Sequence, residues 1–325
     1  MNKKNIQSDE VPNPSEKNKR LLALILKILA TVSMFVFLFS FIGFQETLKK
    51  INSLGIGSAI WILLLLTLQQ FVSALRWGFI LSRIGEKYDS GRVAQMFMAG
   101  AIASSVLITS LAGLSIRVFL LSRSGTKVKR AIYSLVIEKF FAFGTLLICF
   151  IAGMAILTNT DSATPPDSFR FALQIVTGTL VLMGLGLILL ARFKVGKANE
   201  LLDMIRGSVT QPKVFSIVLL LSAFIVILGF YSVVIISNGL NVGVSLIALI
   251  AIQPGIAIMS SLPLSLGGWG VREASMVVGL GLLGVEAVDA LAISLTYGML
   301  SILATFVAAG ASLLMRMSVG EGRMQ

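Results

Sequence analysis

Phe215–Ser237 reads FSIVLLLSAFIVILGFYSVVIIS, an apolar run without a single charged side chain. An α-helix of about 20 apolar residues is long enough to cross the hydrocarbon core of a bilayer. Five further runs of similar length and composition occur along the chain: Leu21–Phe44, Gly55–Leu81, Ala131–Leu157, Phe171–Ala191 and Ala290–Met315. The sequence therefore predicts an all-α polytopic membrane protein with about six full spans.

The composition agrees with a membrane location and argues against several classes of function. Apolar residues make up 56% of the chain and charged residues 13%, against roughly a quarter charged in soluble domains. The chain has no histidine and one cysteine, Cys149, inside a predicted span. We therefore expect no catalytic triad, haem, zinc site or other metal or cofactor site. The net charge of +12 comes from basic residues in short loops, so no nucleic-acid partner is expected.

Basic residues also predict the orientation, because short cytoplasmic loops collect Lys and Arg. They concentrate in the N-terminal tail and in residues 82–92, 122–130 and 192–213, whereas residues 159–170, 238–243 and 284–289 contain few. We therefore expect two cytoplasmic tails, 1–20 and 317–325, around one transmembrane domain, 21–316, in a bacterial or archaeal cytoplasmic membrane. Arg76 and Trp77, near the cytoplasmic end of the second span, are predicted to reach the lipid headgroups.

Two further apolar stretches, 93–121 and 244–283, are interrupted by Gly, Ser, Pro and Arg. The loops flanking each stretch are predicted to lie on the same side of the membrane, so each stretch must return to the side it entered. The first hairpin enters from the cytoplasm and the second from outside, whether they are re-entrant or two short full helices. The chain thus divides into a first half, 21–157, and a second half, 171–316.

One short motif occurs in both hairpins. Ser110-Leu-Ala-Gly-Leu-Ser-Ile-Arg117 aligns without a gap with Ser265-Leu-Gly-Gly-Trp-Gly-Val-Arg272, at an offset of 155 residues. Because the two hairpins enter from opposite sides, the sequence predicts an inverted repeat. Many transporters are built this way, with the substrate site near the midplane of the membrane.

The motif combines residue types that favour an anion. Irregular backbone at this depth must be buried in protein or line a wet cavity. A helix N-terminus offers free amides, and an arginine can pair bidentately with phosphate. We expect no catalytic residue, and predict the following substrate-binding residues: Ser265, Gly267, Gly268, Gly270, Arg272 and Glu273 in the second half, and Gly113, Ser115, Arg117 and Glu138 in the first.

A structural interpretation stands beside the functional one for these residues. The glycine clusters could form tight turns between helices, with the arginines anchored at the headgroups. Glu138 lies about 10 Å into its span at 1.5 Å per residue. At that depth it requires a partner such as Arg117 or Lys139, unless it belongs to an interfacial pair that reaches water.

The segment Leu262-Pro-Leu-Ser-Leu-Gly-Gly-Trp-Gly-Val-Arg-Glu-Ala274 closely resembles the signature of the lysylphosphatidylglycerol synthase transmembrane, or flippase-like, family. Further similar positions are Arg76-Trp77, Gly113, Arg117, Val136-Ile-Glu-Lys139 and Ala287–Ala292. The resemblance implies a membrane module that binds or moves anionic or lipid-linked substrates, sometimes fused to a cytoplasmic aminoacyl-transferase domain. The first motif departs from the family pattern at Ile108 and Ser115, where a proline and an acidic residue are expected.

The resulting prediction is a stand-alone flippase-like module. It would bind an anionic phospholipid or a polyprenyl-phosphate-type lipid and move it between leaflets, passively or with an ion or proton gradient, since the chain has no GxxxxGK[ST] loop. One alternative is an accessory subunit that presents a lipid-linked substrate to a separate glycosyl- or aminoacyl-transferase. Another is a membrane-embedded transferase that uses Glu138 or Glu273 as general base.

Overall fold

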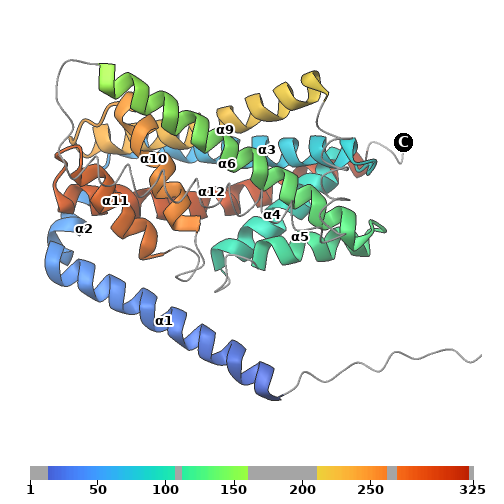
Figure 1. Ribbon diagram of the computed structural model, residues 1–325, viewed down its shortest axis with the longest axis horizontal. Coiled ribbons are helices and arrows are strands. Elements are labelled where there is room, and N and C mark those ends of the chain that lie inside the picture. The colour runs from blue at the N-terminus through green and yellow to red at the C-terminus, as the bar shows by residue number, and fades with distance from the viewer. Residues whose placement is uncertain (1–13, 107–111, 160–210, 262–268, 322–325) are drawn as a thin grey trace, which may run out of the picture.

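The computed structural model describes residues 14–106, 112–159, 211–261 and 269–321, which form a helical bundle (Figure 1). The helices in these ranges are α1 (Pro14–Ile42), α2 (Phe44–Asn52), α3 (Ile56–Arg83), α4 (Ser90–Val106), α5 (Ala112–Arg123), α6 (Val128–Asn159), α9 (Pro212–Gly239), α10 (Leu246–Ser261), α11 (Val271–Gly281) and α12 (Ala287–Glu321).

Four of these helices, α3, α6, α9 and α12, are long and apolar enough to span a bilayer. They coincide with four of the six predicted spans. Of the other two, 171–191 lies outside the described residues, and the first is broken, because α1 and α2 meet at an angle of 84°. The break occurs at Gly43, whose φ of +94° glycine adopts without a steric penalty. The described part of the chain thus contains four spans, or five if the bent pair counts as one.

The two interrupted stretches form pairs of shorter helices, as the sequence predicted. α4 and α5 contain 17 and 12 residues, and α10 and α11 contain 16 and 11, all fewer than the roughly 20 residues of a full span. At the base of the first pair, Arg130 donates to Glu86 at 3.0 Å. At the base of the second pair, Asn241 and Glu286 line one cavity. Each hairpin therefore begins and ends at one end of the bundle, and the two bases lie at opposite ends (Figure 1).

The contacts between helices follow the same scheme in the two halves. α4 packs against α5, α3 and α12, while α10 packs against α11, α9 and α6. α5 also contacts α6, α11 contacts α12, and α3 and α9 contact each other. Each of these contacts therefore has a counterpart when α3, α4, α5 and α6 are exchanged for α9, α10, α11 and α12.

Small residues allow close backbone approach where the short helices cross their neighbours. A Cβ at Gly113 of α5 would collide with the carbonyl oxygen of Gly100 and the hydroxyl of Ser104 on α4. A Cβ at Gly153 of α6 would lie 2.6 Å from the backbone nitrogen of Ala251 on α10. Within a membrane, where burial of apolar surface does not drive helix association, such crossings supply the packing that holds helices together.

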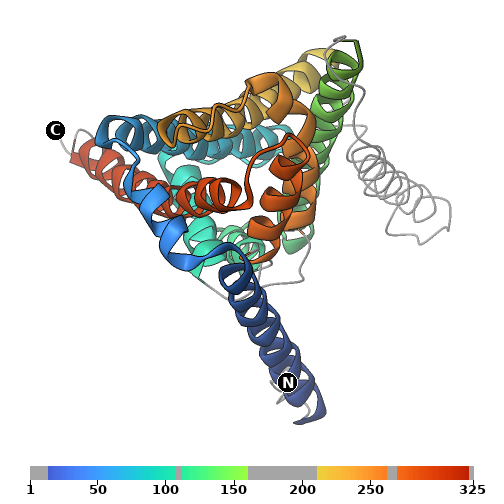
Figure 2. The ribbon, with the colours of Figure 1, turned by 90° about the vertical axis from the view of Figure 1, so that its left-hand side faces the viewer.

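α1 is the helix least attached to the bundle. Figure 2 shows it projecting from the other helices, and its main contacts are with α2 and α11. The ring of Phe35 lies 6.2 Å from that of Trp269, and Met34 packs against Gly270. α2 is held separately, because Lys50 forms an ion pair with Asp289 of α12 at 2.8 Å. The bend at Gly43 thus joins an anchored helix to a loosely attached one.

The hairpin arrangement predicts which positions can be labelled from one side of the membrane. In a Cys149→Ser background, cysteines placed at Lys87 and Lys127 should react with an impermeant maleimide from the same side, and a cysteine at Glu286 from the other. Lys87 and Lys127 flank the base of the α4–α5 hairpin, whereas Glu286 lies at the base of the other. Labelling after permeabilisation gives the control. If the cysteines at positions 87 and 127 reacted from opposite sides, residues 93–121 would cross the membrane, and the assignment of the first hairpin would be wrong.

Candidate functional site

Three charged side chains from the first half meet inside the bundle: Arg76 of α3, Arg117 of α5 and Glu138 of α6. The Glu138 carboxylate forms an ion pair with Arg117 through Oε2 and with Arg76 through Oε1, the latter at 3.4 Å. Arg76 also donates from Nη1 to the hydroxyl of Ser222 on α9 at 2.9 Å. The three charged residues are only 5 to 6% exposed. Four helices thus converge on one dry charged cluster.

Aromatic rings and a glycine fix the position of Arg117 in this cluster. Its guanidinium carbon lies 4.1 Å from the centroid of the Trp77 ring and 4.8 Å from that of Phe97. Such cation–π contacts strengthen when they are desolvated. Trp77 is itself fully buried and donates from Nε1 to the hydroxyl of Ser134 at 3.2 Å. A Cβ at Gly100 would lie 2.6 Å from Cγ of Arg117, so the glycine leaves room for the arginine stem.

The cluster contains more positive than negative charge. Two guanidinium groups face one carboxylate, and the Nε atoms of both Arg76 and Arg117 are buried without a hydrogen-bond partner among the described residues. An unsatisfied buried donor is unfavourable by about 1–3 kcal/mol. Arginine donors match carboxylate and phosphate oxygens. The arrangement is therefore suited to a further anion.

Sequence reasoning identified part of this cluster and missed another part. Of the two partners suggested for Glu138, Arg117 forms the ion pair. The prediction that Arg76 and Trp77 reach the headgroups is wrong, because both are buried and each has partners within the bundle. The two remaining first-half candidates do not join the charged groups by any described contact: Gly113 packs at the α4–α5 crossing, and Ser115 is exposed on α5.

A second network surrounds Glu273 at the start of α11. Its Oε2 accepts a hydrogen bond from the backbone N–H of Gly270 at 2.6 Å. Its Oε1 accepts from Nε and Nη2 of Arg272 at 3.0 and 2.6 Å, and from the hydroxyl of Ser294 on α12 at 3.4 Å. Glu273 is 0% exposed. The carboxylate thereby closes the first turn of α11 and neutralises Arg272.

Arg272 lies between an aromatic ring and a glycine, as Arg117 does. Its guanidinium carbon is 4.4 Å from the centroid of the Trp269 ring. A Cβ at Gly298 of α12 would overlap its guanidinium group. The structure thus brings Gly270, Arg272 and Glu273 into contact with one another and with α12, which the sequence did not indicate. The other second-half candidates, Ser265, Gly267 and Gly268, lie outside the described residues.

Gly298→Ala should displace the Arg272 guanidinium without changing any charge, because the new methyl group would occupy the same space. We expect the free energy of unfolding to fall by about 1–3 kcal/mol, the usual range for overpacking. We also expect weaker binding of any ligand that contacts Arg272. Thermal unfolding of the purified protein measures the first effect. Gly310→Ala on the same helix is the control, since no atom lies within 4 Å of the added carbon. Equal stability of the two variants would contradict the packing of Arg272 on α12.

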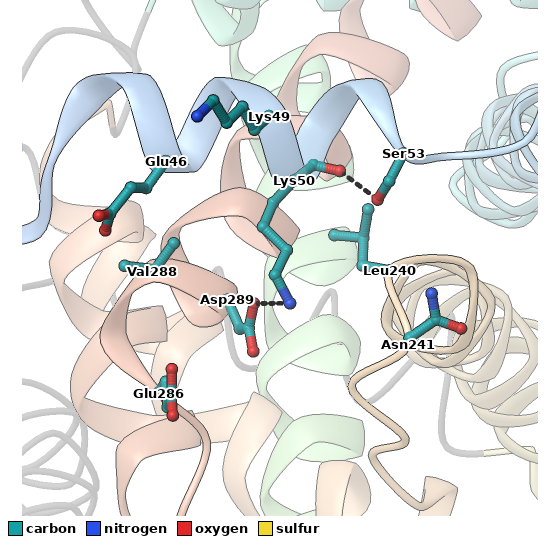
Figure 3. A pocket seen from close by; sticks show the side chains of 9 residues that line it. All are labelled: Glu46, Lys49, Lys50, Ser53, Leu240, Asn241, Glu286, Val288 and Asp289. Carbon is teal, nitrogen blue, oxygen red and sulfur yellow. Dashed lines mark hydrogen bonds and ion pairs between the residues drawn. The ribbon is translucent and has the colours of Figure 1, made fainter.

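A third polar region is an open cavity of about 520 Å³ at the base of the second hairpin (Figure 3). The residues that line it are Glu46, Lys49, Lys50, Ser53, Leu240, Asn241, Glu286, Val288 and Asp289. The acidic residues 286 and 289 lie at the N-terminus of α12, and the two lysines in the last turn of α2. Charges of these signs stabilise these helix ends, so the charges of the cavity do not require a ligand.

The long apolar helices and the buried charges define an integral membrane protein of the polytopic α-helical class. The family model described as the lysylphosphatidylglycerol synthase TM region matches residues 24–309. The chain therefore belongs to this family, as the segment 262–274 indicated. No curated protein matches the chain. In the described ranges, no group of three acidic or cysteine side chains is placed to hold a metal ion.

Proposed function

We propose that this protein binds the phosphate-bearing headgroup of an anionic phospholipid or lipid-linked substrate and allows it to change leaflets. The observation that carries the proposal is the buried excess of positive charge at Arg76, Arg117 and Glu138. A headgroup that crosses hydrocarbon unaided loses its hydration without compensation. Buried guanidinium donors lower this barrier without covalent chemistry, while the acyl chains remain in the bilayer.

An inverted repeat would give each leaflet its own hairpin. Three observations support it. The helices α3 and α9 are equally long and begin 156 residues apart, and the motif arginines Arg117 and Arg272 are 155 residues apart. Each contact between helices that was compared above also has a counterpart in the other half. Transporters with such repeats alternate access around a central site. In this scheme each arginine receives the headgroup from the side where its hairpin enters.

The engagement of the two candidate carboxylates supports the proposal of a non-enzymatic role. A general base must direct a free lone pair at its substrate. Glu138 is held by two arginines, and Glu273 accepts hydrogen bonds from a backbone amide, an arginine and a serine. The bonding of both groups favours structural and electrostatic roles.

In keeping with the distribution of basic residues, we place both termini in the cytoplasm.

Lipid exchange between leaflets tests the proposal. The purified protein is reconstituted into liposomes that contain a fluorescent phosphatidylglycerol in both leaflets, and a membrane-impermeant reductant bleaches the outer leaflet. Wild-type protein should make the inner pool accessible, and Arg117→Gln should not. Arg130→Gln is the matched control, because Arg130 is a half-exposed arginine at the base of the first hairpin. If wild type binds the lipid without exchanging it, the protein presents the lipid to a separate transferase instead.

A further inference from the structure

We propose that exposed Lys and Arg side chains at the base of the first hairpin form a basic surface that gathers anionic lipids of the adjacent leaflet. The basic surface consists of Arg83, Lys87, Arg92, Arg123, Lys127 and Lys129. We further infer that it supplies the buried cluster of α3, α5 and α6 with headgroups, and this second part rests on the proposed function. The gathering of lipids does not depend on that function.

The basic surface comes from two segments that the structure holds side by side. Residues 83–92 lead from α3 into α4, and residues 123–130 lead from α5 into α6. Arg92 donates to the hydroxyl of Ser124 at 3.1 Å, and the hydroxyl of Thr126 donates to Glu86 at 3.0 Å. Cations that are far apart in the sequence therefore surround the base of one hairpin.

The positive charge of the basic surface is largely uncompensated. All six of its side chains are exposed. Of the two acidic residues in these segments, Glu86 pairs with Arg130, so neither of that pair adds to the balance. The other, Asp89, accepts a hydrogen bond from a backbone N–H at the start of α4. Six cations against one remaining carboxylate leave a net charge of +5.

The base of the second hairpin has no such excess. Three acidic and two basic side chains line the cavity there: Glu46, Glu286 and Asp289, and Lys49 and Lys50. The rule that cytoplasmic loops collect Lys and Arg explains the side on which the cations lie. It requires only that they flank the spans. The structure adds that they gather around one hairpin and remain exposed.

A layer of phospholipid headgroups fits this surface. Long Lys and Arg side chains at the ends of membrane helices extend into the headgroup region. Two of the arginines lie over aromatic rings, Arg83 at 4.8 Å from the centroid of Phe79 and Arg92 at 5.8 Å from that of Tyr88. Each cation near an anionic leaflet strengthens the attraction about fivefold. The surface should therefore favour any anionic lipid over a zwitterionic one.

The basic surface lies close to the buried cluster. At 1.5 Å per residue, Arg117 is about 9 Å along α5 from Arg123. Arg76 is about 10 Å along α3 from Arg83 by the same measure. The Debye length at physiological ionic strength is about 8 Å. Lipids gathered at the surface are therefore about one Debye length from the buried arginines, which raises the local concentration of headgroups for the cluster.

A fluorophore placed beside the basic surface tests the inference. In a Cys149→Ser background, Val128→Cys is labelled with bimane, because Val128 is exposed between Lys127 and Lys129. The full-length protein is reconstituted into phosphatidylcholine vesicles. These contain increasing amounts of phosphatidylglycerol or phosphatidylcholine that bears a nitroxide near the headgroup, which quenches bimane on contact. Bimane at Glu286→Cys, exposed at the base of the second hairpin, is the control position.

Two triple variants separate charge from side-chain shape. The neutralised variant combines Lys87→Gln, Arg123→Gln and Lys127→Gln, and the charge-conserving variant combines Lys87→Arg, Arg123→Lys and Lys127→Arg. The other three cations of the surface remain in both, and labelling of position 128 with an impermeant maleimide verifies that each variant keeps its orientation. Thermal unfolding is measured in parallel.

In wild type, labelled phosphatidylglycerol should half-quench position 128 at an at least about tenfold lower content than labelled phosphatidylcholine, given about fivefold per cation. The neutralised variant should lose most of this difference, and the charge-conserving variant should keep it. Position 286 should show no difference. At about 1 M salt, where the Debye length is about 3 Å, wild type should also lose the difference. At low phosphatidylglycerol content, lipid exchange should be slower in the neutralised variant than in the charge-conserving one.

Three results contradict the inference. Equal quenching by the two lipids at position 128 of wild type would leave an acidic soluble protein as the occupant. A neutralised variant that keeps the wild-type difference would exclude the six cations as its cause. Equal exchange rates of the two triple variants would exclude supply to the buried cluster. Wild type at high salt still decides if the neutralised variant does not fold. Lipid preference without any exchange contradicts the proposed function alone, whereas exchange without lipid preference contradicts this inference alone.

Discussion

Glu273→Ala should lower the free energy of unfolding by about 3–5 kcal/mol, the effect of removing one partner of a buried ion pair. The change leaves the guanidinium of Arg272 without its carboxylate and the N–H of Gly270 without its acceptor. It also removes the side chain that closes the first turn of α11. Chemical unfolding in mixed micelles measures the loss.

Glu286→Gln is the control for this prediction. Glu286 is exposed just before the first turn of α12 and has no described ion pair. We expect its replacement to change stability by no more than about 0.5 kcal/mol. A Glu273 variant that matched this control would show that the network around the carboxylate does not stabilise α11.

Gly113→Ala should separate α5 from α4 and destabilise the protein by about 3 kcal/mol, at the upper end of overpacking effects. The added carbon would collide with the carbonyl oxygen of Gly100, a backbone atom that cannot rotate away. Because Arg117 lies one turn further along α5, the shift should also weaken its ion pair with Glu138. We therefore expect loss of lipid exchange together with the loss of stability.

Gly144→Ala gives the matched comparison, since the same substitution on α6 meets no atom within 4 Å. Replacing glycine by alanine in the middle of a helix stabilises it by roughly 0.5–1 kcal/mol. Thermal unfolding of the two variants should therefore shift in opposite directions. If both variants were more stable than wild type, the result would contradict the close approach of the α4 and α5 backbones at Gly113.

The overall arrangement of helices could be predicted because it depends on local composition. Apolar runs of the required length predicted α3, α6, α9 and α12, and the interrupted runs predicted the two hairpins. The bend between α1 and α2 was missed, because Gly43 lies within a long, mainly apolar run, with the apolar residues Phe41 and Ile42 before it and Phe44 after it. A glycine allows such a bend but does not require it.

Only those residues of the candidate site whose charge is unusual at their predicted depth in the membrane could be identified from the sequence. Glu138 required a cation, and Arg117 was a candidate partner on the basis of its depth and motif. Arg76 was interpreted as an interfacial anchor because it lies next to a tryptophan near the end of a span. Its partners Glu138 and Ser222 are 62 and 146 residues away in the sequence, so only the packed structure reveals that it belongs to the cluster.

The long sequence separations around α3 have a consequence for biogenesis. Gln69 donates to the carbonyl of Ile225 on α9, and Gln70 donates to the hydroxyl of Thr305 on α12. Arg76 depends in the same way on Glu138 and Ser222. When α3 is synthesised, none of these partners exists, and a lone arginine in hydrocarbon is unfavourable. The polar side chains of α3 can therefore obtain these partners only after α6, α9 and α12 have been synthesised.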